Sequence, residues 1–69
     1  MEFPIGENIK RLRMEQNMTQ RALAFQLGVS DQAVSKWETG KSYPDVPMLA
    51  DIATLFGVSI DKLFEKEAS

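Results

Sequence analysis

The chain has 69 residues, 43% of them hydrophobic, and this length allows one small domain of modest stability, because so short a chain buries only about 60% of its unfolded surface. It contains neither cysteine nor histidine, which excludes disulfides and removes the commonest metal ligands and the commonest general base. The formal net charge is −2 and no apolar run approaches the roughly 20 residues of a membrane-spanning helix, so we expect a soluble, cytoplasmic protein without metal or cofactor.

The charges are distributed unevenly along the chain. Residues 10–41 hold six basic and three acidic side chains, a net charge of +3, whereas the other residues together carry −5. One interpretation is ordinary surface charge. The other is a positive face turned toward a nucleic acid and a negative face turned away from it.

Apolar residues at helical spacing predict a first helix over 5–16. Pro4 suits its start, because the N–H that proline lacks would have no partner there, and Asn17 is expected to end it. The apolar stripe consists of Ile5, Ile9 and Leu12.

Two short helices with a tight corner between them are predicted next. Thr19 caps the first of them, and Ser30 caps the second, which runs to about Thr39. Gly28 ends the first in the left-handed conformation that glycine adopts cheaply. We assign Trp37 to the core rather than to base stacking. The apolar side of this unit consists of Leu23, Ala24, Leu27, Val29, Val34 and Trp37.

Two further helices are predicted in the C-terminal half. Asp45 caps the earlier one and Gly57 ends it, and Ser59 caps the last one. Their apolar positions are Val46, Leu49, Ile52, Ala53 and Phe56, then Ile60, Leu63 and Phe64. No segment has a strand pattern, so we predict an all-α single domain over residues 1–69, with its core over about 5–64 and frayed last residues.

The helix over about 30–39 separates an apolar side from a polar side. Glutamine suits adenine, lysine suits guanine and alanine suits the thymine methyl group, whereas an ordinary solvated helix more often carries Glu and Lys. A solvated amphipathic face is the alternative. The expected DNA base contacts are Asp31, Gln32, Ala33, Ser35 and Lys36.

Contacts to the DNA backbone are expected beside this face. Gln20 begins a helix, where unpaired N–H groups and the helix dipole favour a phosphate. The loop after the polar helix supplies further donors. The expected phosphate contacts are Gln20, Ser30, Lys41, Ser42 and Tyr43.

Arg13 and Glu38 have two interpretations. An ion pair between them would tie the first helix to the end of the polar helix and orient it. Alternatively, Arg13 contacts a phosphate. We favour the ion pair, in which removal of Glu38 alone is costly because the arginine loses its partner.

These residues together resemble the Cro/C1-type (XRE) helix-turn-helix family of phage and bacterial repressors, over about residues 5–64. The resemblance implies a compact five-helix bundle of the lambda-repressor-like type, whose second and third helices bind DNA. It also implies transcriptional control, usually as a repressor, by dimers on a two-fold-symmetric operator. By position it supports the contacts of Gln20 and the polar face and the pairing of Arg13 with Glu38. The matching residues are Thr19-Gln20, Leu23-Ala24, Leu27-Gly28-Val29-Ser30, Val34-Ser35, Trp37-Glu38-Thr39-Gly40, Pro44, Leu49, Ile52-Ala53, Phe56-Gly57-Val58-Ser59 and Leu63.

Two residues depart from the family pattern. Asp31 is repelled by phosphates, but it can accept a hydrogen bond from cytosine N4 and so narrow the choice of sequence. Phe25 stands where a charged residue is usual. It either packs locally, for example on Arg21 one turn earlier, or marks a surface for a partner protein, and we favour local packing.

The leading functional prediction is sequence-specific binding of double-stranded DNA by a transcriptional regulator. The alternatives are the antitoxin of a toxin–antitoxin pair and a protein-interaction module that has lost DNA binding. An enzyme is not expected, because histidine and cysteine are absent and the acidic residues are dispersed. A homodimer, at least on DNA, is expected to form through Val58, Ile60 and Phe64.

Overall fold

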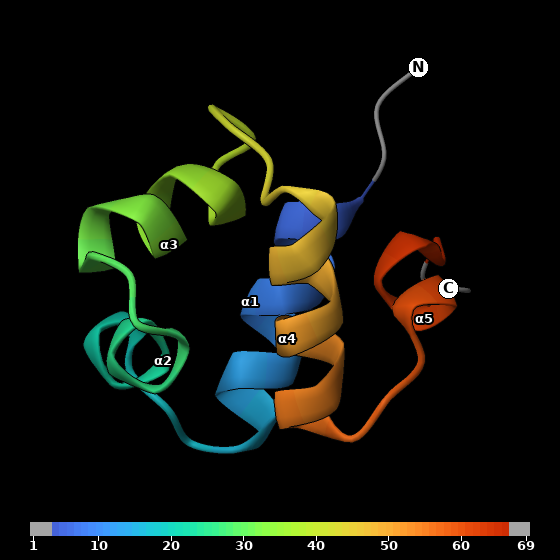
Figure 1. The fold of residues 1–69 in the computed structure, drawn as a ribbon, viewed down its shortest axis with the longest axis horizontal. Helices are drawn as coiled ribbons and strands as arrows, with labels where there is room; N and C mark the ends of the chain where they lie inside the picture. The colour runs from blue at the N-terminus through green and yellow to red at the C-terminus, as the bar shows by residue number, and fades with distance from the viewer. Residues whose placement is uncertain (1–3, 67–69) are drawn as a thin grey trace.

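Five helices form the part of the protein that the computed structural model describes, residues 4–66 (Figure 1). They are α1 (Ile5–Glu15), α2 (Gln20–Leu27), α3 (Asp31–Glu38), α4 (Val46–Phe56) and α5 (Ile60–Phe64). No strand occurs between residues 4 and 66, and the predicted all-α fold is confirmed. The predicted fraying of the last residues concerns positions 67–69, which lie outside the described range. No helix in that range is long and apolar enough to cross a membrane.

Side-chain caps begin three of the helices, as the sequence predicts. The side-chain oxygens of Thr19, Ser30 and Asp45 each accept a hydrogen bond from the backbone N–H three residues later, at 2.9 to 3.2 Å. Ser59 precedes α5 with an extended backbone, but its side chain makes no capping hydrogen bond. Ser59 is thus the N-cap of α5 by position, as predicted, but without the side-chain hydrogen bond.

Left-handed residues end the helices at the predicted positions. Gly28 follows α2 with φ of 72°, and Gly57 follows α4 with φ of 70°. A side chain at either glycine would be strained, because a Cβ atom crowds the following carbonyl in this conformation. Asn17, just past α1, has φ of 57°, which agrees with its predicted place at the end of the helix.

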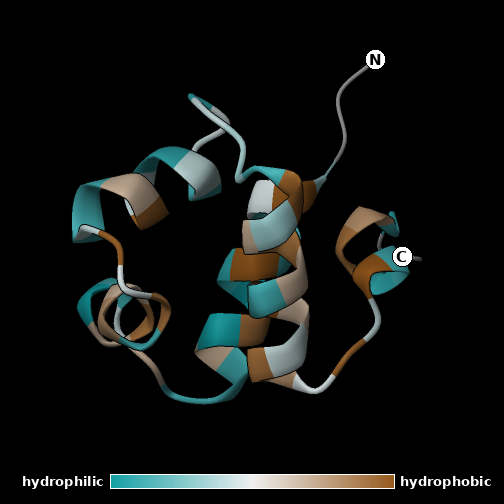
Figure 2. Cartoon of the chain, in the orientation of Figure 1, coloured by the Kyte–Doolittle hydropathy of each residue, from teal (hydrophilic) through white to brown (hydrophobic). Residues whose placement is uncertain are grey.

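The core lies between all five helices. α1 and α4 run through the middle of the domain, with α2 and α3 on one side of them and α5 on the other (Figure 1). Figure 2 shows hydrophobic segments on both α1 and α4, whereas hydrophilic colours follow the loop after α3. Each helix contributes one of the five largest fully buried side chains: Ile9, Leu23, Val34, Ile52 and Leu63.

Val46 does not belong to this core. It is 73% exposed, although its spacing placed it in the apolar stripe of α4. It is the first residue of α4, and Leu49 is the first buried residue of the stripe. The periodic pattern thus begins one position of the stripe before burial does.

α1 approaches the last turn of α3 through Gly6. A methyl group at this position would overlap the carbonyl oxygen of Trp37 and lie 3.2 Å from the carbonyl carbon of Glu38. Only the absence of a side chain lets the two backbones come so close. The sequence gives no signal for this role, because Gly6 lies inside a helix and not at a turn.

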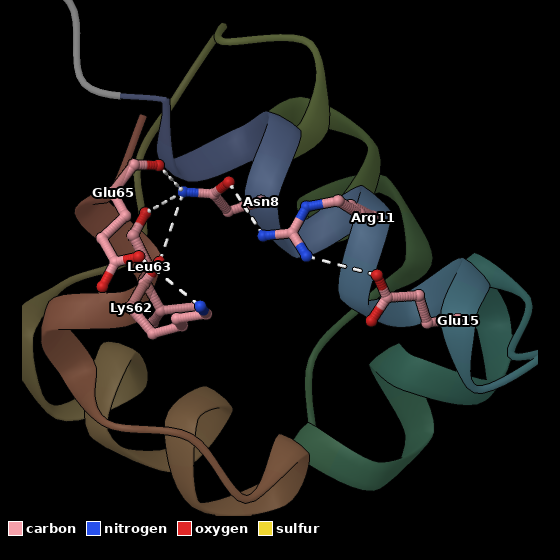
Figure 3. Close-up of polar contacts among 6 residues, drawn as sticks. All are labelled: Asn8, Arg11, Glu15, Lys62, Leu63 and Glu65. Atoms are coloured by element: carbon pink, nitrogen blue, oxygen red, sulfur yellow. Dashed lines mark hydrogen bonds and ion pairs between the residues drawn. The ribbon is translucent and has the colours of Figure 1, made fainter. Parts of the chain in front are cut away.

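Asn8 ties α1 to the end of α5 (Figure 3). Its side chain is buried, and Nδ2 donates to the carbonyl oxygens of Leu63 at 2.7 Å and Glu65 at 2.9 Å. Carbonyl groups at a helix end have no partner inside the helix, so a donor from α1 satisfies them. On its other side Asn8 Oδ1 accepts from Arg11 Nη2 at 3.3 Å, and Arg11 also pairs with Glu15. This cluster fixes α5 on the face of α1 that lies away from α3.

Candidate nucleic-acid interface

α3 presents its polar side to solvent and its apolar side to the core. Val34 and Trp37 are buried, which fixes the helix on the domain. On the other side, three of the predicted base-contact residues, Asp31, Gln32 and Lys36, are exposed. The other two predicted contacts, Ala33 and Ser35, are partly buried and flank this face. The arrangement leaves amide, ammonium and carboxylate groups on a rigid helix surface.

The predicted phosphate contacts surround that face at its two ends. Gln20 is the first residue of α2, and Ser30 precedes the first residue of α3. The oxygen of Ser30 accepts from Ala33 N at 3.2 Å, which leaves the hydroxyl hydrogen to donate elsewhere. Both helix beginnings also carry backbone N–H groups without partners inside the helix.

The loop after α3 is folded back on the end of that helix. The backbone N–H groups of Lys41 and Ser42 both donate to the carbonyl oxygen of Lys36, at 2.9 and 3.4 Å. The side chains of Lys41 and Tyr43 are exposed, and that of Ser42 is partly buried. The loop thereby keeps its donors beside the exposed face of α3.

The ion pair between Arg13 and Glu38 is present in the structure. Arg13 Nε lies 2.7 Å from Glu38 Oε2, and Nη2 donates to Oε1 at 3.1 Å. The remaining nitrogen, Nη1, donates to the carbonyl oxygen of Met18 at 2.7 Å. All three guanidinium nitrogens thus have acceptors inside the protein, which favours the ion pair over a phosphate contact for Arg13.

This pair is mostly shielded from water. The exposed fractions of the two side chains are 11% for Arg13 and 3% for Glu38. The hydrogen bond to Glu38 raises the pKa of Arg13 above its ordinary value, with a smaller contribution from the charge of Glu38 and against the effect of desolvation. A raised pKa for a cation means that the stabilisation is complete at neutral pH and is lost only when the pH rises through the pKa of the folded state.

Glu38 has a second partner that the sequence did not reveal. Nε2 of Gln20 donates to Glu38 Oε1 at 3.0 Å, so one carboxylate links α1, α2 and α3. The two residues are 18 positions apart and share no local pattern. From the sequence, phosphate is the only partner predicted for Gln20.

Lysine side chains lie on and just after α3. Within residues 4–66, Lys36 and Lys41 take part in no ion pair, so their charges are available to a polyanion. The segment from α5 to residue 66, which begins on the far side of α1 and α4 from α3, carries Asp61 and Glu65 but also Lys62 and Lys66, so its charges balance (Figure 1).

The residues predicted for a dimer interface lie on that far side as well. Ile60 is exposed at the start of α5, and Val58 and Phe64 are partly buried against the core. α5, and the turn that leads into it, lie on the opposite side of α1 and α4 from α3 (Figure 1). A dimer contact through them would leave α3 uncovered.

Phe25 lies in a different environment from the one that was favoured from the sequence. The favoured prediction of local packing is wrong, because Phe25 is 76% exposed on the outer surface of α2. The core side of α2 is occupied by Leu23 and Ala24, and the helical spacing turns Phe25 away from them.

Known proteins are similar to this chain in sequence and in fold. A family model described as helix-turn-helix matches residues 9–63. The HTH-type transcriptional activator BcrR of Enterococcus faecalis is 48% identical over 67 residues, which are 97% of this chain and 32% of BcrR. The P22 c2 repressor, in a crystal structure with synthetic operator 9T, superimposes with a TM-score of 0.84 and 28% identity, over 97% of this chain and 100% of that one.

A part of an enzyme has the same shape. Hydroxypropylphosphonic acid epoxidase from S. wedmorenis matches 91% of this chain with a TM-score of 0.82 and 31% identity, but the match covers only 34% of the epoxidase chain. This chain thus spans about a third of BcrR and of the epoxidase, and all of the P22 c2 repressor chain in the complex.

Proposed function

Because this chain belongs to the helix-turn-helix family, we propose that it binds double-stranded DNA in a sequence-specific manner and regulates transcription. The observation that carries the proposal is the exposed polar face of α3, which Val34 and Trp37 anchor from behind. An α-helix with small polar and amide side chains fits the major groove, where each base pair has a distinct pattern of donors and acceptors. A helix presented in this way needs no rearrangement of the domain to enter the groove.

The exposed residues of α3 read the bases in this proposal. Gln32 pairs with adenine N6 and N7, and Lys36 donates to guanine O6 and N7. Asp31 accepts from cytosine N4, and its charge penalises sites where it meets only phosphates. Ala33 and Ser35 complete the contact at the edges of the face.

Phosphate contacts set the position of α3 in the groove. Gln20 and Ser30 act at the beginnings of α2 and α3, where the helix dipoles favour an anion. Lys41, Ser42 and Tyr43 act from the loop that folds onto the end of α3. Such contacts contribute affinity and orientation rather than sequence preference.

The protein binds DNA as a homodimer in this proposal, on an operator with two-fold symmetry. Val58, Ile60 and Phe64 form the contact between the two copies, on the side of the domain away from α3. The regulator acts in the cytoplasm in this proposal. No catalytic role is proposed for this chain, and the epoxidase resembles it over only a third of the enzyme.

Selection of bound sequences from random duplexes tests the proposal. We expect a motif with two half-sites in inverted orientation, about one helical turn apart. The affinity for the selected duplex should then fall as salt rises, because lysine and arginine release counterions from the phosphates. Absence of binding at low salt, or an affinity that salt does not change, would refute DNA binding. Selection of a single half-site would refute the dimer alone.

A further inference from the structure

The side-chain amide of Gln20 contacts a carboxylate whose position is fixed. Glu38 Oε1 accepts from Gln20 Nε2 at 3.0 Å and from Arg13 Nη2 at 3.1 Å, and Oε2 accepts from Arg13 Nε at 2.7 Å. The guanidinium is planar and rigid, so a two-point contact holds both carboxylate oxygens in place. Glu38 therefore offers Gln20 one acceptor at a defined position.

This contact selects one of the two orientations of the Gln20 amide. An amide has a nitrogen with two donor hydrogens and an oxygen that only accepts, whereas an ionised carboxylate only accepts. Turning the amide over would bring its oxygen against Oε1 of Glu38, and two acceptors repel each other. Because Glu38 is nearly buried, little water is present to screen that repulsion. The nitrogen therefore faces Glu38 and uses one of its two hydrogens.

The other hydrogen lies on a nitrogen at the beginning of α2. Gln20 is the first residue of that helix, and the side chain of Thr19 satisfies the backbone N–H of Ala22. The backbone N–H groups that precede Ala22 in α2 have no partner inside the helix and can bind an anion. The side-chain N–H of Gln20 adds one more donor beside them. A phosphate group accepts hydrogen bonds and cannot use the amide oxygen. The orientation of the Gln20 amide thus decides whether this side chain attracts or repels a phosphate.

We propose that Glu38 is a positioning residue for DNA binding, which acts through Gln20. Its carboxylate, held by Arg13, orients the Gln20 nitrogen so that one N–H bonds Glu38 and the second bonds a DNA phosphate. The inference rests on the proposed DNA binding. It adds that Arg13 of α1, through Glu38, supports the contact of Gln20 with a DNA phosphate. Glu38 itself does not touch the DNA.

A double-mutant cycle on the selected duplex tests the inference. In Glu38→Gln an amide that both donates and accepts replaces a carboxylate that only accepts, so the Gln20 amide is no longer held with its nitrogen toward position 38. We expect Gln20→Ala to weaken binding roughly tenfold in the native background, as for a hydrogen bond to a charged group. In the Glu38→Gln background the same substitution should change the Kd less than about twofold.

Asn8→Ala provides the matched control background. It also removes buried hydrogen bonds made by a side chain of α1, but these bonds hold α5 and not α2 or α3. Gln20→Ala should keep its roughly tenfold effect there, because a general loss of stability does not alter the amide of Gln20. An undiminished effect in the Glu38→Gln background overturns the inference, and so does an effect that shrinks equally in the Asn8→Ala background.

A measurement on the native chain replaces the cycle if Glu38→Gln does not fold. NMR follows the exchange of the two Nε2 hydrogens of Gln20, free and bound to the duplex. We expect one hydrogen to be protected in both states and the second to become protected only in the complex. Loss of the first protection upon DNA binding overturns the positioning role while leaving DNA binding intact. Failure of the native chain to bind any duplex overturns both.

Discussion

The substitution Gly6→Ala tests how strongly the backbone of α1 positions α3. The new methyl group would overlap the carbonyl oxygen of Trp37, and its next neighbours are the backbone carbons of Trp37 and Glu38, at 3.0 and 3.2 Å. These atoms belong to the backbone, so no rotamer change relieves the contact, and the two helices must move apart. Because Glu38 holds Arg13 and Gln20, such a movement also disturbs the network behind the proposed DNA-binding face.

Two opposing effects determine the size of the change. Alanine is favoured over glycine inside a helix by about 1 kcal/mol. Overpacking costs about 1 to 3 kcal/mol, and a clash between backbones lies at the upper end of that range. We therefore expect a net loss of about 2 kcal/mol in the free energy of unfolding. For a domain of this size each kcal/mol lowers the Tm by roughly 4 to 8 °C, so the Tm should fall by about 8 to 16 °C.

Thermal and urea unfolding measure the loss of stability. The DNA affinity, at a temperature where the variant is folded, measures the disturbance of the network behind the proposed DNA-binding face. Lys10→Ala is a suitable control, because Lys10 is exposed on the same helix, and its effect should stay within about 0.5 kcal/mol. A Gly6→Ala variant that is as stable as the native chain, or more stable, would show that helix propensity dominates. The close packing of α1 on α3 would then not limit the stability of the domain.

Three further predictions concern other parts of the molecule. Gln32→Ala and Lys36→Ala should each weaken binding to the selected duplex by about 1 to 3 kcal/mol without lowering the Tm. Lys66→Ala, which removes a positive charge beyond α5, should change the affinity little. A large fall in the Tm of the Gln32 or Lys36 variant would mean that the replaced side chain belongs to the core. Asn8→Ala should lower the free energy of unfolding by about 1 to 3 kcal/mol, because two carbonyl groups at the end of α5 lose their donor. Hydrogen exchange should then show that α5 opens before the other helices. Uniform loss of protection in all helices would contradict this local role. Ile60→Asp should leave the monomer folded and abolish cooperative binding to a duplex with two half-sites, and undiminished cooperativity would move the dimer contact elsewhere.

Local chemistry made most of the fold predictable from the sequence. The caps at Thr19, Ser30 and Asp45 and the left-handed glycines at 28 and 57 depend on atoms within a few residues along the chain. Helical periodicity likewise marks the inward side of each helix, because a helix turns by a fixed angle at every residue. The helix bounds, the core and the polar face of α3 follow from these short-range rules.

Some local signals were incomplete in an informative way. Val46 continues the apolar spacing of α4 but lies outside the contact between helices, and Phe25 is apolar but faces away from the core. Ser59 has the right chemistry for a cap and makes no capping hydrogen bond. Periodicity and residue type say which side of a helix can be buried, whereas burial itself requires that another element covers that side.

Five helices, their ends and an exposed helix suited to DNA follow from residues that are close together along the chain. How that helix is held depends on the packing of the helices against one another. Gly6 meets the backbone of Trp37, Asn8 satisfies the end of α5, and Glu38 joins Arg13 to Gln20. The partners in each of these contacts lie far apart along the chain, so their distance depends on the packing of whole helices, and no local pattern encodes it.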